Sequence, residues 1–242
     1  MAAEGDTIFL YTYDGDIFVP IRRYMYRGGQ TGYSFRVTHV TVHEDVTVIS
    51  EEAFCGSSNS RNRHIIDVNF HDKVEKIEKC GFCSLLHLRR VIMRGVKVVE
   101  EHAFYYCEAL EDVECGNLEI IQSGAFLKCE SLRSINLTSA RIVEVEAFRE
   151  CGALEDVKFG GKLERIEMEA FRNCKSLERI TIPLKDGLIN DDDVFMGCEN
   201  LDQVDLVEGE LHETIDALHS EEWKNDMNVE IDSINLILPN AD

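Results

Sequence analysis

Residues 125–135 read AFLKCESLRSI, and close copies of this segment return along the chain at a nearly constant interval. The copies share the pattern Ala-Phe-x-x-Cys-x-x-Leu, with Val in place of Ala in the last one. Their phenylalanines lie 22, 22, 23 and 24 residues apart, at Phe104, Phe126, Phe148, Phe171 and Phe195. A period in the low twenties is typical of a solenoid, in which each repeat contacts mainly its neighbours and a core forms only by stacking.

The same register continues towards the N-terminus, where Phe82 stands 22 residues before Phe104 and Phe54 stands 28 residues before Phe82. The longer step contains a polar run at residues 57–64, which predicts a surface loop inserted between two coils. We expect the phenylalanines to fill the centres of the coils as a ladder: Phe54, Phe82, Phe104, Phe126, Phe148, Phe171 and Phe195.

Cysteine follows the phenylalanine by three residues in five of the copies, which predicts a second ladder of small buried side chains. Neighbouring members would be near enough for a disulfide by distance alone, but we expect free thiols. The ladder consists of Cys107, Cys129, Cys151, Cys174 and Cys198.

Each phenylalanine is followed by a short unit such as Leu132-Ile135-Leu137, whose last two apolar positions lie two residues apart. This spacing places both side chains on one face of a short strand, and stacking of the coils sets the strands side by side as a parallel sheet. A second apolar element, such as LEIIQSGAF at residues 118–126, precedes the phenylalanine. We interpret it as a return segment on the opposite side of the coil that leads into a short helical turn.

The segments IQSGAFLKCESLRSI (121–135) and IEMEAFRNCKSLERI (166–180) resemble the leucine-rich repeats of the BspA-like type, or type 5. The resemblance covers about residues 37–207, as seven to eight repeats of 22–24 residues, although only Ile182-Pro183 keeps the Ile-Pro that usually follows the strand. It implies an α/β solenoid, a right-handed superhelix with a parallel sheet on its concave side. It also implies protein–protein recognition without a shared catalytic site.

The two ends of the chain are expected to seal the solenoid. Residues 7–20, TIFLYTYDGDIFVP, predict two strands joined by a tight turn, so we assign residues 1–36 as an N-terminal β-hairpin cap. Residues 208–242 predict an amphipathic helix that caps the last coil, or alternatively joins two copies or docks elsewhere. Its apolar face comprises Trp223, Met227, Ile231, Ile234 and Leu238.

The chain is strongly acidic, with 25 Lys and Arg against 46 Asp and Glu, a net charge of −21. This balance disfavours nucleic acid and anionic membranes as partners. The acid either provides solubility alone or favours a basic protein partner. Neither a signal peptide nor a membrane-spanning stretch is evident, so we expect a cytoplasmic or nuclear protein rather than an extracellular adhesin, a role seen among similar repeats.

Few residues suggest chemistry, and we expect no enzyme and no cofactor. Most of the 9 cysteines are expected as thiols. Cys80 and Cys83 form a lone Cys-x-x-Cys, which with Cys55 leaves a thiol or metal-binding protein open as an alternative, although a zinc site needs further ligands. Asp191–Asp193 lacks the pattern of a calcium loop and is expected to be an acidic loop.

Binding is expected on the concave strands, at the positions that alternate with buried ones. The first strands contribute His39, Thr41, Asp67 and Asn69. The candidate protein-binding residues are Arg90, Ile92, Asp112, Glu114, Ser134, Asn136, Asp156, Lys158, Arg179, Thr181, Gln203 and Asp205. Arg90 and Arg179 are of the type that dominates interfaces. The basic group Arg89, Arg90, Arg94 and Lys97 is interpreted as a solvated edge, and the oligomeric state stays open.

Overall fold

The computed structural model describes residues 7–14, 17–29, 37–56, 64–185, 187–189 and 193–207, with side chains from residue 23 onward. Within these ranges the chain forms sixteen β-strands and no helix. None of the described residues forms a helix that could cross a membrane. The predicted C-terminal helix at 208–242, most of the insertion at 57–64 and two of the three Asp191–Asp193 residues lie outside the described part.

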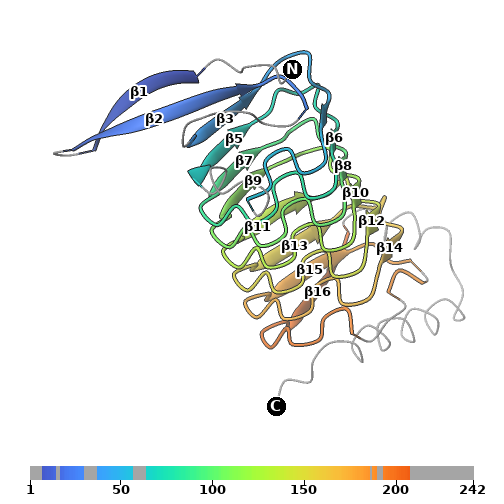
Figure 1. The fold of residues 1–242 in the computed structure, drawn as a ribbon. Coiled ribbons are helices and arrows are strands. Elements are labelled where there is room, and N and C mark those ends of the chain that lie inside the picture. The colour runs from blue at the N-terminus through green and yellow to red at the C-terminus, as the bar shows by residue number, and fades with distance from the viewer. Residues whose placement is uncertain are drawn as a thin grey trace, which may run out of the picture.

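Ten of the strands form one large sheet, in which all neighbours from β2 onward run parallel (Figure 1). β1 pairs antiparallel with β2, with Asp14 opposite Ile17. In spatial order the strands are β1 (Thr7–Asp14), β2 (Ile17–Tyr26), β3 (His39–Val42), β5 (Asp67–Asn69), β7 (Arg90–Ile92), β9 (Asp112–Glu114), β11 (Ser134–Leu137), β13 (Asp156–Phe159), β15 (Arg179–Ile182) and β16 (Gln203–Leu206).

A second, smaller parallel sheet lies across the core from the large one (Figure 1). Its two-residue strands are the predicted return segments, and each of six successive coils contributes one, while the next coil adds a single bridge between Ile166 and Ile189. They are β4 (Val48–Ile49), β6 (Lys76–Ile77), β8 (Val98–Val99), β10 (Ile120–Ile121), β12 (Ile142–Val143) and β14 (Arg165–Ile166). The prediction of a stacked solenoid with a parallel sheet is confirmed. We number the coils one to seven after the ladder phenylalanines, from Phe54 to Phe195.

The Ala-Phe segments form a third side of each coil, built from turns rather than helix. In the third coil the amide of Ala103 donates to Glu100 and that of Cys107 to Phe104, while the amide of Phe104 donates across to Ala125 of the next coil at 2.8 Å. A helix would direct these amides to its own carbonyls and leave none for the neighbour. The predicted helical turn, and with it the α/β class, is therefore wrong for the described residues.

In the second to sixth coils this turn geometry includes two left-handed residues, two positions before and two after the phenylalanine, and the first and seventh coils each have one. In the third coil these are His102 and Tyr106, with φ of 56° and 61°. Glycine occupies such a position at Gly124 and Gly197, but most coils use ordinary residues there. We call the outward surface of these segments, from four residues before to two after each ladder phenylalanine, the turn wall.

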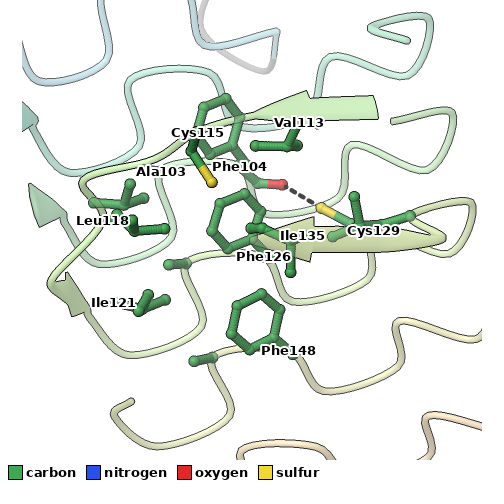
Figure 2. Close-up of a cluster of buried hydrophobic side chains, with 14 of the residues drawn as sticks. Ala103, Phe104, Val113, Cys115, Leu118, Ile121, Phe126, Cys129, Ile135 and Phe148 are labelled. Carbon is green, nitrogen blue, oxygen red and sulfur yellow. Dashed lines mark hydrogen bonds between the residues drawn. The ribbon is translucent and has the colours of Figure 1, made fainter. Parts of the chain in front are cut away.

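The ladder phenylalanines stack through the middle of the solenoid. Their ring centroids lie 5.0 to 5.7 Å apart, with ring planes within 16° of parallel. Figure 2 shows Phe104, Phe126 and Phe148 in this arrangement. Tyr26 of β2 is buried and its ring lies 4.8 Å from Phe54, so a residue of the predicted N-terminal cap covers the first ring of the ladder.

The five ladder cysteines are buried free thiols that bind the backbone of the preceding coil. The Cys129 Sγ donates to the carbonyl of Phe104 at 3.3 Å (Figure 2), and Cys151 donates to Phe126 at 3.2 Å. The same contact recurs for the other three, Cys107, Cys174 and Cys198. Cysteine fits this position because it is small and apolar yet carries a weak S–H donor.

Candidate protein-binding surfaces

The exposed side of the large sheet, which we call the strand face, carries two rows of side chains in register across the coils. They alternate along each strand with the buried residues of the core. The first row is His39, Asp67, Arg90, Asp112, Ser134, Asp156, Arg179 and Gln203. The second row is Thr41, Asn69, Ile92, Glu114, Asn136, Lys158, Thr181 and Asp205.

Arg90 and Arg179 on the strand face bind acidic or polar neighbours on the next strand. The Arg90 Nε lies 3.1 Å from Asp112 Oδ2, and its Nη2 lies 3.5 Å from Glu114. Arg179 donates from Nε to Gln203 at 3.1 Å. These groups are about half exposed, so each pair stabilises the fold by about 0–1 kcal/mol. A partner must therefore compete with internal contacts for these two arginines.

The middle of the strand face has no ion pair among the described residues, although Asn136 Oδ1 accepts hydrogen bonds from the amide and hydroxyl of Thr138. Ser134, Asn136, Asp156 and Lys158 are exposed, and in the described part of the chain none of them takes part in an ion pair. Thr181, in contrast, is 9% exposed and is the one candidate that is buried. We call the group of four the central strand face.

The N-terminal end of the strand face carries His39, which is half buried beside Asp67. Burial lowers the pKa of this imidazole, and Asp67 partly opposes the shift. The ring is therefore neutral at pH 7, so β3 adds no positive charge to this face.

The basic group predicted as an edge is largely neutralised by neighbouring coils. Arg94 donates to Glu114 at 2.7 Å, and Lys97 binds Glu75 at 2.8 Å. Arg89 is exposed and makes no ion pair with any described residue. The group therefore offers one unpaired cation rather than four.

The turn wall of the third coil carries partly exposed tyrosine side chains, which the two rows of the strand face lack. Tyr105 and Tyr106 are half buried, and every other Phe or Tyr side chain that the structure describes is buried. Lys128 of the next coil lies over the Tyr106 ring, 5.5 Å from its centroid. Sequence reasoning missed this pair, although the two x positions of AFYYC hold aromatic residues in this copy alone.

A shallow hollow of about 420 Å³ lies beside the turn wall of the fourth to sixth coils. It exists because Gly152 has no side chain at a position that holds Glu130 one coil earlier and Lys175 one coil later. The lining residues are Glu130, Glu150, Gly152, Asn173 and Lys175. Its volume falls within the range of small-molecule sites, but its lining is charged rather than apolar.

Comparison with known proteins agrees with this architecture. Residues 31–141 and 119–221 match the model of the BspA type leucine-rich repeat region, in six copies. The chain belongs to this family. Proteins of this repeat class commonly bind other proteins and are generally not enzymes. A search of curated proteins finds no significant match.

Solved structures that resemble this BspA-type chain include leucine-rich repeat proteins. The T. pallidum protein TpLRR is 20% identical over 88% of this chain and 94% of its own, with a TM-score of 0.46. A leucine-rich cell surface protein from Faecalibacterium prausnitzii is 15% identical over 84% and 88%, with a TM-score of 0.27. A Bacteroides ovatus leucine-rich repeat protein is 16% identical over 82% and 70%, with a TM-score of 0.35.

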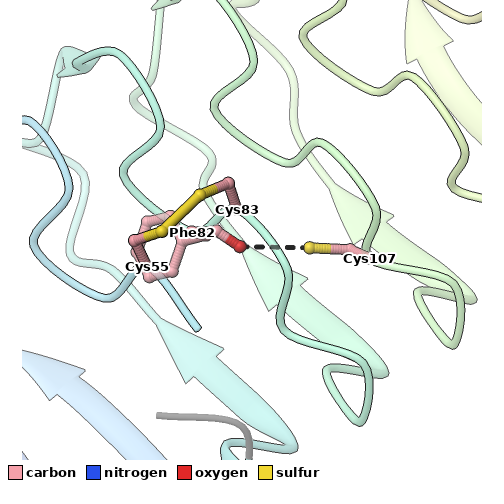
Figure 3. The surroundings of a disulfide bond; sticks show 4 residues. All are labelled: Cys55, Phe82, Cys83 and Cys107. Atoms are coloured by element: carbon pink, nitrogen blue, oxygen red, sulfur yellow. Dashed lines mark hydrogen bonds between the residues drawn. A yellow bond between two sulfur atoms is a disulfide. The ribbon is translucent and has the colours of Figure 1, made fainter. Parts of the chain in front are cut away.

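The cysteines outside the ladder of this BspA-type chain are arranged differently from the Cys-x-x-Cys alternative. Cys83 is bonded to Cys55, which holds the equivalent position one coil earlier, with the Cα atoms 4.7 Å apart (Figure 3). Cys80 is a half-buried free thiol whose pKa is raised by burial. In the described structure Cys83 is therefore paired with Cys55, and Cys80 and Cys83 do not act together as a Cys-x-x-Cys pair. Among the described residues, no three His, Cys, Asp or Glu side chains lie close enough to hold a metal ion.

Proposed function

We propose that this chain is a non-catalytic interaction module that binds a protein partner through the strand face. The family supports the general role, because leucine-rich repeats commonly act as protein-interaction scaffolds. The observation that carries the choice of surface is the central strand face, where four exposed polar side chains stand in register on adjacent strands without internal ion pairs. Such groups bind a partner without first breaking an internal salt bridge.

The partner that suits this surface is a basic protein. The net charge of −21 speeds the approach of a cationic partner by electrostatic steering and opposes an acidic one. Asp156 is the unpaired carboxylate at the centre of the strand face, and Lys158 beside it fixes the register of charges that the partner must match. Nucleic acid and anionic membrane do not fit the same charge.

The proposal also covers the structure of the two ends of the chain. We assign residues 1–36 as the N-terminal cap, which the packing of Tyr26 on Phe54 supports. We assign residues 208–242 as a C-terminal helix that either covers the last coil or joins two copies. The right-handed superhelix with the strand face on its concave side follows from the family resemblance.

The test compares two charge-matched double variants in a pull-down from native lysate read by mass spectrometry. Asp156→Ala with Lys158→Ala alters the central strand face, whereas Asp72→Ala with Lys73→Ala alters exposed residues in the turn after β5. Each double variant removes one acidic and one basic side chain, neither of which takes part in an ion pair with a described residue. A protein retained by wild type and the control but lost by the strand-face variant supports the proposal. Equal capture by all three contradicts it.

A further inference from the structure

The turn wall of the third and fourth coils differs from the rest of this surface because aromatic and uncharged side chains lie next to its charged ones. Its third coil presents His102, Tyr105 and Tyr106 together with Glu100 and Glu101, which pair with Lys76 and Lys79 of the second coil. Its fourth coil presents Gln122, Ser123, Gly124, Leu127 and Lys128. Ion pairs flank the aromatic side chains on both sides: Lys79 of the second coil with Glu101, and Arg149 of the fifth coil with Glu146 and Glu169. An aromatic centre with a charged rim is the anatomy of an interface hot spot.

The aromatic rings at this centre lie against one another. The His102 and Tyr105 rings are 5.3 Å apart, and Tyr105 and Tyr106 are 5.7 Å apart. Gly124 leaves room for His102, because a Cβ built there would meet the imidazole ring at 2.5 Å. We call Tyr105 and Tyr106 the tyrosine pair.

Two unpaired carboxylates lie beside the tyrosine pair. Glu108 follows Tyr106 by two residues, and Glu130 holds the same position in the next coil, where the amide of Ser131 donates to the Glu108 carbonyl at 3.1 Å. Neither carboxylate takes part in an ion pair with a described residue. Glu130 also lines the hollow at Gly152, so space for a further side chain adjoins it.

The tyrosine rings and the two carboxylates together favour a ligand that is cationic and also stacks on aromatic rings. Lys128 already lies over one face of Tyr106 in a cation–π contact, and its ammonium group is also 3.7 Å from Glu150. A guanidinium group meets both requirements, because it is planar, stacks on tyrosine and donates several hydrogen bonds to carboxylates. Lysine offers the charge without the planar stacking.

We infer that the tyrosine pair, with Glu108 and Glu130, forms a second protein-binding surface that takes an arginine side chain of a partner. The inference rests on the proposed function only in that the partner is a protein, since it uses the turn wall and not the strand face. The arginine lies over Tyr105 and directs its guanidinium towards the two carboxylates.

The test is a titration of the ¹⁵N-labelled protein with the blocked peptide Ac-Gly-Arg-Gly-NH₂, followed by amide chemical shifts. The matched probe is the same peptide with citrulline, which keeps the shape of arginine but lacks its charge. We expect saturable shifts in the millimolar range at the amides of residues 105–108 and 128–131, and at least fivefold weaker binding of the citrulline peptide. Absent shifts, or shifts spread evenly over carboxylate-bearing residues of every coil, would overturn the inference.

The variants keep the fold by using residues that other coils tolerate at the same positions. Tyr105→Leu copies Leu127, and Tyr106→Asn copies Asn173, which has the same φ of 61°. We expect this double variant to lose the arginine-dependent shifts, and Met196→Ala, at the position of Tyr105 in the seventh coil, to keep them. Unchanged binding by the double variant would also overturn the inference. Asp156→Ala with Lys158→Ala should leave the titration unaltered, so the two proposals fail independently.

Discussion

At the scale of single residues, the ladder cysteines join adjacent coils through a contact that few side chains could replace. Each thiol is small enough for the core and donates to the phenylalanine carbonyl of the preceding coil. Serine would carry a stronger donor but a more polar group in an apolar site, and alanine would leave the carbonyl with one donor fewer.

Cys151→Ala should lower the free energy of unfolding by about 1 kcal/mol, from the lost S–H contact and the small void. Urea unfolding followed by circular dichroism measures the change. Ala153→Gly, at a half-buried position in the same coil outside the ladder, serves as a comparison for a loss of similar volume. An unchanged midpoint for Cys151→Ala would show that the thiol contact does not contribute.

Burial also makes the ladder sensitive to alkaline pH, because it raises the pKa of Cys107 from 9.0 to about 12. Above pH 9 the unfolded chain loses this proton while the folded chain keeps it, so the unfolded state binds fewer protons and stability falls as pH rises. The slope approaches about 1.4 kcal/mol per pH unit for each such thiol between pH 9 and 12. Urea midpoints at pH 7.5 and 10.5 should drop less in Cys107→Ala than in wild type. Equal drops would contradict the buried-thiol assignment.

At the scale of elements, the turn wall is the part of each coil whose structure the sequence pattern did not predict. The period and the apolar spacing predicted both strands of each coil and the stacked phenylalanines. The turns were missed because most of their left-handed positions hold residues such as Glu, Lys, Tyr or His, and only Gly124 and Gly197 are glycine, so no single residue type marks them. The Cys55–Cys83 pairing was hidden by the 28-residue step, since the insertion obscures that both cysteines directly follow a ladder phenylalanine.

Replacing serine by glycine should have opposite effects on stability at a left-handed position and at a position that is not left-handed. Ser84→Gly should stabilise the protein by about 0.5–1 kcal/mol, because Ser84 has a φ of 59° that glycine adopts freely. Ser131→Gly should destabilise it by a similar amount, since Ser131 is not left-handed and glycine there adds only unfolded-state entropy. Thermal unfolding of both variants measures the contrast, and effects of the same sign would refute the turn geometry.

At the scale of the whole molecule, stability passes from coil to coil through the phenylalanine stack. A repeat protein gains its core only from neighbours, so an interior coil supports two interfaces and a terminal coil one. Phe126 contacts rings on both sides, at 5.1 and 5.2 Å, whereas Phe195 contacts one ladder ring, Phe171, among the described residues.

Phe126→Ala should therefore lower the free energy of unfolding by about 3–5 kcal/mol. Phe195→Ala should cost less, and hydrogen exchange should localise its effect to the sixth and seventh coils. Loss of protection across all coils in both variants would show that the solenoid unfolds as one unit and not coil by coil.

The function was only partly readable from the sequence. Alternation along the strands predicted which residues face outward, but ion pairing between coils sets which of them are free to bind, and that depends on register. Arg90 and Arg179 are the strongest candidates by residue type, yet they are paired, whereas Asp156 and Lys158 on a strand between them take part in no ion pair with a described residue.

The most direct measurement is the dissociation constant of the captured partner, by calorimetry, for wild type and the two charge-matched variants. We predict at least about a tenfold weakening for Asp156→Ala with Lys158→Ala, equivalent to about 1.4 kcal/mol. Asp72→Ala with Lys73→Ala should stay within twofold of wild type. Equal dissociation constants for all three proteins would contradict binding through the strand face.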